Sequence, residues 1–249
     1  TAEKAGAIIL NHSKVVNFEY KATGQLKGVI TEDLYKRQHR WNAKVIINAT
    51  GIQSDNIRRQ VDNNVEKKIM ISRGTHIVLK EDLCPTDLGV LLPSTDDGRV
   101  LFVLPFFGQT LVGTTDTPCT ILEANKPSKE EEIYLINHLK SLFPDLKSPT
   151  IQSQWAGGRP LLRPKNDTNT SQIVREHEVE VLPCGLISAM GGKWTTCRKI
   201  ALDTLKAVET ALEQPLANPK QLPLLGTSKI TSLTSSHLKE QSNELKKYL

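Results

Sequence analysis

The stretch Met190-Gly191-Gly192-Lys193-Trp194-Thr195-Thr196-Cys197-Arg198-Lys199 (MGGKWTTCRK) joins an apolar run to an amphipathic one. The preceding residues 185–190 are a strand candidate. Apolar side chains at helical spacing over residues 194–212 predict a helix of about five turns, with Trp194 taking part in packing. A strand-Gly-Gly-helix turn lets backbone N–H groups and the positive end of a helix dipole approach an electron-rich ligand. The spacing matches neither the P-loop nor GxGxxG, so a tight turn with a solvated lysine stays open as the alternative.

A similar junction occupies residues 44–51 (KVIINATG). Residues 45–47 are apolar without alternation, which predicts a strand covered on both faces, as in a parallel sheet flanked by helices. Open α/β sheets bind ligands at the carboxyl ends of their strands, where Gly51 falls here. A buried strand followed by an ordinary turn fits the same residues. Upstream, short strands are expected over residues 7–10, 14–20 and 26–32.

Residues 68–117 follow a different pattern, in which short strand candidates alternate with Gly, Pro and Asp turns. This pattern predicts an antiparallel sheet. A helix follows, with Ser128 as its N-cap and Glu131 three residues later in a capping box. Its expected buried side consists of five apolar residues, Ile133, Leu135, Ile136, Leu139 and Leu142. Strands over residues 150–161 and 172–183 are expected to return to that sheet, so the fold class is α/β (α+β overall).

The composition of the 249 residues is that of an ordinary globular protein, with a net charge of +5 spread along the chain. This charge argues against nucleic acid as a partner. Four cysteines without CxxC spacing argue against a metal site. His177 and its glutamate neighbours cannot share a metal, because consecutive strand residues point to opposite faces. No apolar run approaches the roughly 20 residues that span a bilayer. Residues 1–6 resemble the last turn of a helix, so we expect a fragment without its N-terminal part.

Six motifs occur in order along the chain, namely KVIINATG, ISRGTHIVL, LVGTTDTP, GGRPLL, VREHEVEV and MGGKWTTCRK. Together they resemble the FAD-dependent glycerol-3-phosphate dehydrogenases, which belong to the amino-acid-oxidase-like flavoprotein superfamily. The resemblance covers residues 5–225 and includes LPLLG, which is similar to the LPGG-type element before the family's C-terminal helical domain. Each motif alone is weak, and the set in register is specific.

The resemblance implies a partial Rossmann-like FAD-binding domain with an antiparallel-sheet substrate domain inserted into it. Residues 1–51 and 185–213 would form the FAD-binding domain and residues 52–184 the substrate-binding domain. Residues 214–249 would form a linker and the start of a C-terminal helical domain. The GxGxxG fingerprint that takes the FAD pyrophosphate is not found in this sequence, and we expect it upstream of Thr1. We therefore expect the fragment alone to be inactive.

The family's FAD contacts match two turns of this sequence. The turn near the FAD phosphates and ribitol corresponds to Ala49, Thr50 and Gly51. The segment beneath the pyrimidine end of the flavin corresponds to four residues, Gly191, Gly192, Lys193 and Thr195. Reduced flavin carries negative charge near N1 and O2, which a helix N-terminus and a lysine would stabilise.

Three further residues match the family's substrate site. His76 corresponds to the active-site histidine, whose near-neutral pKa suits a base, and Arg159 corresponds to the arginine that contacts the substrate. Arg175 corresponds to the arginine associated with the substrate phosphate. The alternatives are a histidine satisfied within a sheet and arginines in surface ion pairs. Asp116 is expected to cap a turn.

The implied activity is oxidation of sn-glycerol 3-phosphate to dihydroxyacetone phosphate by hydride transfer to FAD, with the electrons passed to a quinone. A lipid-soluble acceptor implies peripheral association with a membrane, either the cytoplasmic face of the bacterial inner membrane or the mitochondrial inner membrane. One alternative is a related flavin oxidase that uses O₂ on glycerol 3-phosphate or an amino acid. A second is a non-catalytic binding module that retains the fold.

Overall fold

The computed structural model describes residues 2–84, 88–93, 95, 98–163 and 176–216. The chain divides into two compact units, one of residues 1–13 and 216–249 and one of residues 14–215. In the first unit a 3-10 turn, Glu3–Ala5, ends at Gly6 with a φ of +92°, as the predicted helix end requires. Residues 7–10 are exposed and form no strand, so that prediction is wrong. A strand needs a pairing partner, and none of the described strands pairs with these residues. The predictions for Arg175 and for residues 217–249 lie outside the described residues.

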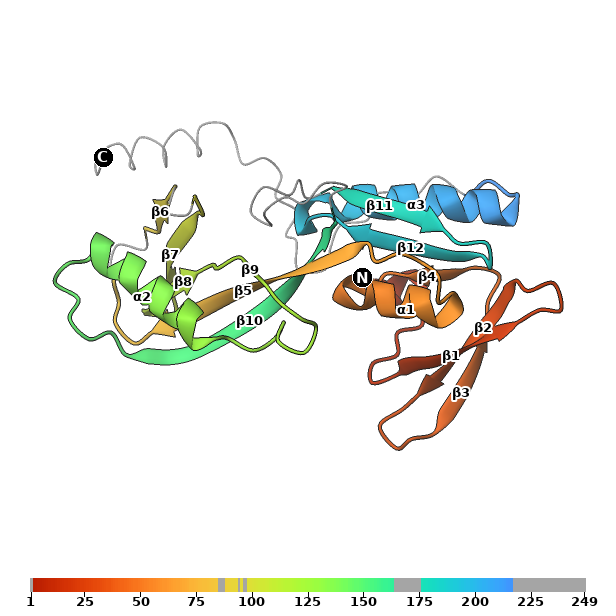
Figure 1. Ribbon diagram of the computed structural model, residues 1–249, viewed down its shortest axis with the longest axis horizontal. Coiled ribbons are helices and arrows are strands. Elements are labelled where there is room, and N and C mark those ends of the chain that lie inside the picture. Colours follow the sequence, from red (N-terminus) through yellow and green to blue (C-terminus); the bar gives the residue numbers. More distant parts are fainter. Residues whose placement is uncertain (1, 85–87, 94, 96–97, 164–175, 217–249) are drawn as a thin grey trace. The chain divides into compact units, whose positions relative to one another are not determined.

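The second unit begins with a three-stranded antiparallel sheet (Figure 1). Its strands are β1 (Lys14–Tyr20), β2 (Leu26–Glu32) and β3 (Gln38–Asn42), and β2 is central. The first two have the predicted bounds. The third was not predicted, because all five of its side chains are exposed and it has no apolar alternation.

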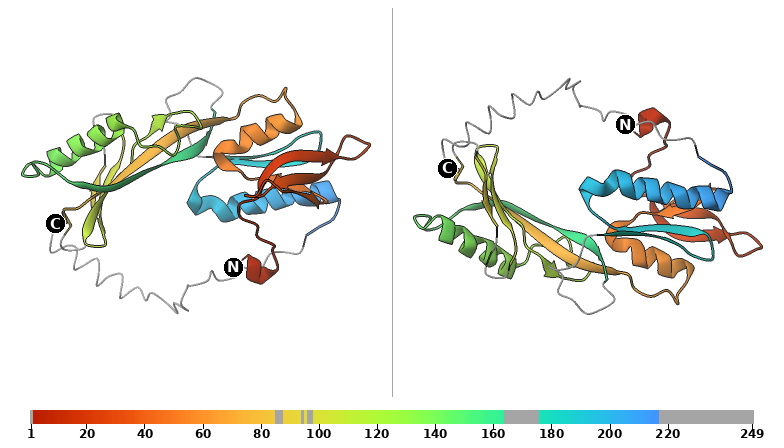
Figure 2. Two further views of the ribbon diagram at one scale, coloured as in Figure 1. Left: turned by 90° about the horizontal axis from the view of Figure 1, so that it is seen from below. Right: turned by 90° about the horizontal axis from the view of Figure 1, so that it is seen from above.

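A second three-stranded sheet has the order β11-β12-β4. Strands β4 (Ile46–Asn48) and β12 (Leu186–Gly191) pair in parallel, which confirms the parallel pairing predicted from residues 45–47. Ile47 is 45% exposed, so the prediction that this strand is covered on both faces is wrong. The helix α1 (Ser54–Val61), entered through the 3-10 turn η2 (Gly51–Gln53), contacts β4 and β12. The helix α3 (Cys197–Leu212), entered through η4 (Trp194–Thr196), contacts β11 and β12. Figure 2 shows α1 and α3 on opposite sides of this sheet.

The strand β11 (His177–Val181) pairs antiparallel with β12. The prediction that residues 172–183 return to the large antiparallel sheet is therefore wrong for residues 177–181. Strand periodicity identifies a strand but contains no information about its neighbour, which here lies only five residues further along the chain, across the turn at Gly185.

The third sheet is antiparallel and has six strands, as the pattern of residues 68–117 predicted. Its main path is β10 (Ile151–Leu162), β5 (Ile69–Leu79), β8 (Gln109–Gly113), β7 (Leu101–Phe106) and β6 (Val90–Leu92), and the short β9 (Thr117–Pro118) pairs with β5. The helix α2 (Lys129–Leu142) begins in the predicted capping box of Ser128 and Glu131.

One core lies between α2 and the six-stranded sheet. Alternate residues of the strands meet Leu135 and Leu139 of the helix, and all of these side chains are fully buried: Ile77, Leu79, Leu101, Val103 and Val112. Ile133 is 50% exposed, so its predicted burial is wrong. It precedes Leu135 by two positions, about 200° around the helix, and so faces away from the sheet. A second core joins the first two sheets and includes Phe18, Leu26, Leu182 and Leu186.

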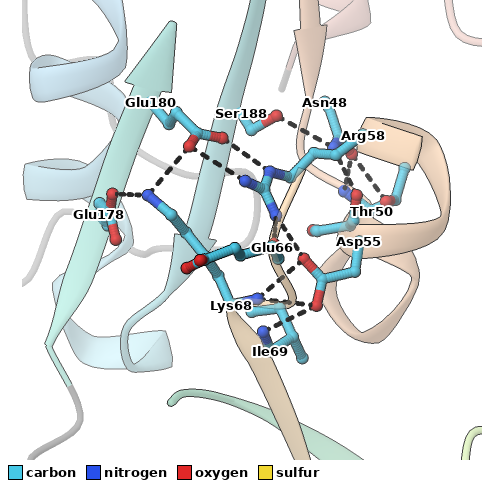
Figure 3. Close-up of polar contacts among 11 residues, drawn as sticks. Asn48, Thr50, Asp55, Arg58, Glu66, Lys68, Ile69, Glu178, Glu180 and Ser188 are labelled. Atoms are coloured by element: carbon cyan, nitrogen blue, oxygen red, sulfur yellow. Dashed lines mark hydrogen bonds and ion pairs between the residues drawn. The ribbon is translucent and has the colours of Figure 1, made fainter. Parts of the chain in front are cut away.

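A buried ion cluster around Arg58 connects α1, β5 and β11 (Figure 3). The Arg58 side chain is 1% exposed. Its guanidinium donates to both carboxylate oxygens of Glu180, at 2.6 and 3.0 Å, to Asp55 at 2.7 Å and to the carbonyl of Glu66 at 2.8 Å. Such bidentate, charge-assisted bonds fix the geometry of both partners.

The carboxylates of this cluster also hold the start of β5. Asp55 accepts hydrogen bonds from the backbone N–H groups of Lys68 and Ile69, the latter at 2.8 Å. The Lys68 ammonium pairs with Glu180 at 2.9 Å and with Glu178. The strand that carries His76 is thus tied to α1 at its first residue, Ile69, and to β11 through the preceding Lys68.

Candidate active site

Two glycine-containing turns follow the parallel strands β4 and β12 and therefore lie at the same edge of their sheet. The buried Asn48 joins them, because its side-chain amide donates to Ser188 of β12 at 3.2 Å and to the carbonyl of Ser54 at 3.0 Å. Its carbonyl oxygen accepts from the Thr50 hydroxyl at 2.7 Å. These bonds fix the turn formed by Ala49, Thr50 and Gly51.

The turn after β12 requires its glycines. Gly191 and Gly192 have φ values of +72° and +87°, in the left-handed region that other residues rarely adopt. A Cβ on Gly191 would lie 2.5 Å from the carbonyl oxygen of Glu176, and one on Gly192 would lie 2.4 Å from Ile200 Cδ1. The glycines therefore allow close packing against β11 and α3. The sequence pattern did not predict this packing role.

Lys193 and Thr195 are exposed at the start of η4. The Thr196 hydroxyl accepts from the Lys193 N–H at 3.1 Å and donates to the Lys193 carbonyl at 3.0 Å, which closes the turn. Trp194 is 91% exposed, so its predicted packing is wrong. Residues 194–196 form a 3-10 turn, and the α-helical spacing that placed Trp194 on the buried side begins only at Cys197.

A cavity of about 440 Å³ lies between β10 and this turn. It is lined by two four-residue stretches, Gly158–Leu161 and Gly192–Thr195. Three predicted site residues, Arg159, Lys193 and Thr195, therefore share one cavity. Gly51 approaches the same stretch of β10, since a Cβ on it would lie 3.9 Å from Pro160.

His76 lies on the face of the six-stranded sheet opposite α2. Its ring stacks on Trp155 of β10, with a centroid separation of 5.7 Å and an interplanar angle of 12°. Gly113 pairs with it on β8, and a Cβ there would lie 2.2 Å from His76 Cδ2. Burial lowers the pKa of His76 below its ordinary 6.5, and the positive charge of Arg159 lowers it further, so the ring is neutral at pH 7.

The Arg159 guanidinium lies over Gly74, where a Cβ would be 2.1 Å from its Nη2. It donates to the carbonyl of Thr115 at 3.0 Å and to the Thr114 hydroxyl at 2.8 Å. These two threonines, in the VGTTDTP motif, were not predicted to act on Arg159. Arg159 also lines a second cavity of about 390 Å³ next to Thr114, Thr115 and Asp116. Asp116, which lies between β8 and β9, accepts a hydrogen bond from the Ser72 hydroxyl of β5.

Arg175 lies outside the described residues, so the structure places the other predicted site residues and not this one. In the part of the chain that the structure describes, no three or more His, Cys, Asp or Glu side chains are grouped to hold a metal ion. None of the described helices combines the length and the apolar character that crossing a membrane requires.

Residues 1–198 match the family described as DAO, FAD dependent oxidoreductase. The chain belongs to this family. It is 36% identical to the probable mitochondrial glycerol-3-phosphate dehydrogenase of Dictyostelium discoideum, over 98% of this chain and 41% of the relative. It is 37% identical to the mitochondrial glycerol-3-phosphate dehydrogenase of Rattus norvegicus, over 84% of this chain and 30% of the relative. The chain therefore spans less than half the length of these relatives.

Solved structures of flavoproteins share the fold. The glycerol-3-phosphate dehydrogenase from Bacillus halodurans, complexed with FAD, is 32% identical, with a TM-score of 0.74 over 86% of this chain and 41% of that one. The FAD-bound L-alpha-glycerophosphate oxidase from Mycoplasma pneumoniae has a TM-score of 0.63 at 19% identity, over 90% of this chain and 58% of that one. The first confirms the predicted resemblance and fold class, and the second is a likeness of fold alone.

Proposed function

We propose that the protein containing this sequence oxidises sn-glycerol 3-phosphate to dihydroxyacetone phosphate with FAD. The observation that carries the proposal is the cavity that brings Arg159 together with Gly192 and Lys193. The charge of the same arginine helps to keep His76 neutral. The similarity to glycerol-3-phosphate dehydrogenases, over 98% and 84% of this chain, also supports the proposal.

The described residues fit one end of an FAD molecule. The Gly192–Thr195 turn offers the start of a helix and the Lys193 charge on an open cavity, which suits the electron-rich pyrimidine edge of a flavin. The Ala49–Gly51 turn at the same sheet edge suits the ribitol and phosphates. When bound, FAD supplies the hydride acceptor.

The chain's own residues would bind and deprotonate the alcohol. Arg159, held by Thr114 and Thr115, presents a fixed guanidinium to the anionic substrate, and Arg175 is proposed to bind the phosphate group. The unprotonated ring nitrogen of His76 accepts the C2 hydroxyl proton, which its lowered pKa permits at pH 7. Stacking on Trp155 fixes the plane of the ring.

We further propose that the electrons pass to a quinone and that the protein associates peripherally with a membrane. The relatives from Dictyostelium discoideum and Rattus norvegicus are mitochondrial and, at 36% and 37% identity, more similar in sequence than the bacterial enzyme at 32%, which favours the mitochondrial inner membrane. If O₂ were the acceptor instead, hydrogen peroxide would form in step with turnover. An amperometric peroxide assay beside a quinone-reduction assay separates the two acceptors.

The proposed activity is tested by mixing the flavin-loaded protein with substrate in the absence of O₂. Glycerol 3-phosphate should bleach the flavin absorbance, whereas glycerol, which lacks the phosphate that the arginines bind, should not. A flavin that stays oxidised with glycerol 3-phosphate would refute the proposed substrate. Bleaching by amino acids instead would assign the protein to the amino-acid oxidase type.

A pair of glycine substitutions on neighbouring strands tests the position of Arg159. Gly74 and Gly157 pair directly, but a Cβ on Gly74 would collide with the Arg159 guanidinium, whereas nothing lies within 4 Å of a Cβ on Gly157. We expect Gly74→Ala to lower kcat/KM for glycerol 3-phosphate about 10- to 100-fold, since a misplacement of about 1 Å costs that much. Gly157→Ala is the matched control and should change it less than about twofold. Equal effects of both would remove Arg159 from the substrate site.

The charge of Lys193 should raise the reduction potential of the flavin. We expect Lys193→Met to lower the two-electron midpoint potential by about 30–60 mV, equivalent to about 1.4–2.8 kcal/mol. The control is Lys199→Met, one turn into α3, where the ammonium pairs with Asp203 at 2.9 Å. Spectroelectrochemical titration of the flavin measures both. An unchanged potential in Lys193→Met would show that the lysine is not near the flavin ring.

A further inference from the structure

The carboxylate of Glu131 has more contacts than a helix cap requires. The residue is 5% exposed, in the first turn of α2 on the far side of the six-stranded sheet from His76. Its two capping-box bonds with Ser128 are both 3.3 Å long. Its bonds from the hydroxyls of Thr75 and Thr115 are shorter, at 2.6 and 2.9 Å. Glutamine forms a capping box as well as glutamate does, so capping alone does not explain this carboxylate.

Both of these threonines are next to predicted site residues. Thr75 directly precedes His76 on β5. The Thr115 hydroxyl accepts a hydrogen bond from the Thr75 backbone N–H at 2.9 Å and gives its own proton to Glu131. The single Thr115 hydroxyl therefore joins β5, the loop after β8 and the start of α2.

The loop held in this way contains two acceptors of hydrogen bonds from the Arg159 guanidinium, which are the Thr115 carbonyl and the Thr114 hydroxyl. The Thr114 hydroxyl also donates to the Thr115 carbonyl, at 3.3 Å. Thr115 therefore links the two residues, since its hydroxyl binds Glu131 on one face of the sheet and its carbonyl binds Arg159 on the other.

The path begins at a charge that is compensated within the core. Arg73 is also buried and its Nε lies 2.8 Å from the Glu131 carboxylate. Burial alone would raise the pKa of Glu131, but hydrogen bonds from Thr75, Thr117 and Thr115 outweigh it and hold the pKa below its ordinary value. An ionised carboxylate accepts only, which fixes the direction of both threonine hydroxyls.

We propose that Glu131 is a positioning residue, which acts through Thr115 to hold the Arg159 guanidinium in its place for an anionic substrate. The carboxylate orients the Thr115 hydroxyl, the hydroxyl anchors the loop to β5, and the loop carbonyl orients the guanidinium. The inference rests on the proposed function in one respect, that Arg159 contacts the substrate.

The test uses four variants of the flavin-loaded protein. Glu131→Gln keeps the capping box but removes the charge, and Thr115→Val removes the hydroxyl while leaving the Glu131–Arg73 pair intact. Both should lower kcat/KM for glycerol 3-phosphate by about 10-fold or more, mainly through KM, with unchanged flavin content. Thr115→Ser keeps the hydroxyl and should restore most of the loss. Ser128→Ala weakens the same cap without touching Thr115, so it should lower Tm and leave kcat/KM within about twofold.

A double-mutant cycle shows whether Thr115 acts through Arg159. In an Arg159→Lys background, Thr115→Val should cost less than about twofold further, because the guanidinium that it positions is gone. The proposal is overturned if the loss of kcat/KM in the double variant is the product of the losses in Thr115→Val and Arg159→Lys. It is also overturned if Ser128→Ala lowers kcat/KM as much as Glu131→Gln does.

Urea unfolding measures the same double-mutant cycle on protein stability, without an activity assay. The shifts of the urea midpoint for Thr115→Val and Arg159→Lys should be non-additive. If glycerol 3-phosphate does not reduce the flavin of the wild-type protein, the proposed function is refuted. The coupling between Thr115 and Arg159 can still be measured in that case. Additive midpoints would refute the positioning role whatever the substrate is.

Discussion

Arg58→Ala should lower the free energy of unfolding by about 3–5 kcal/mol, because it leaves the buried carboxylate of Asp55 without its cation and Glu180 with Lys68 alone. The guanidinium is buried and donates to Glu180 at two atoms and to Asp55 at one. Since Asp55 also holds the backbone of Lys68 and Ile69, the loss should loosen the start of β5. Urea denaturation followed by circular dichroism measures the effect.

The neighbouring Arg59 provides the control. It is exposed on the same helix, and Arg59→Ala should change stability by about 0.5 kcal/mol or less. A loss of less than about 1 kcal/mol for Arg58→Ala would contradict the structural role of the cluster.

The cluster should also make stability depend on pH. Burial alone raises the pKa of Glu180, but hydrogen bonds from Arg58 and Lys68 outweigh it, and the folded-state pKa lies below the ordinary 4.5. A carboxylate with a depressed pKa contributes stability that is present above its unfolded pKa and is lost as the pH falls through the folded one. The wild-type protein should therefore lose this part of its stability below pH 4.5, and Arg58→Ala should show a smaller loss in that range.

His76→Asn should reduce the rate of flavin reduction by glycerol 3-phosphate about 10²- to 10⁴-fold, the usual contribution of a positioned base. Asparagine is close in size and should keep the packing against Trp155 and Gly113. Anaerobic stopped-flow absorbance measures the rate, and circular dichroism and flavin content check the fold. His39→Asn, in the exposed strand β3, is the control and should have the wild-type rate.

The pH profile of the wild-type protein should identify the same group. Burial and the Arg159 charge lower the pKa of His76 below 6.5, so the base is unprotonated throughout the neutral range. The rate should be level above about pH 6.5 and should fall only as the pH drops through the lowered pKa. A rate that is unchanged in His76→Asn would exclude His76 as the base.

Local sequence patterns were sufficient for most of the secondary structure. The capping box of Ser128 and Glu131, the strands β1 and β2 and the parallel pairing indicated by residues 45–47 were all predicted from neighbouring residues. The cap depends on interactions within one element, and the strands and the parallel pairing follow from the order of apolar residues along the chain. The ordered motifs likewise identified the flavoprotein family before any coordinates.

Pairings between distant residues could not be predicted in this way. Arg58 and Glu180 are 122 residues apart in the chain. The residues around each of them do not indicate which charged side chain will be its partner. The same holds for Arg159 and the Thr115 carbonyl, 44 residues apart, and for Thr75 and Glu131, 56 residues apart. Trp194 was misplaced because a 3-10 turn interrupted the helical period.

Sequence alone therefore determined the elements, the family and the candidate residues His76, Arg159 and Lys193. Folding determined what surrounds them, because burial, charge and hydrogen bonding at each site are set by whichever strands become neighbours. The shared cavity of Arg159 and Lys193 exists only because β10 lies beside the turn that follows β12. The MGGKWTTCRK stretch specifies a strand, a turn and a helix, and the cavity that it shares with an arginine of another sheet comes from the tertiary structure.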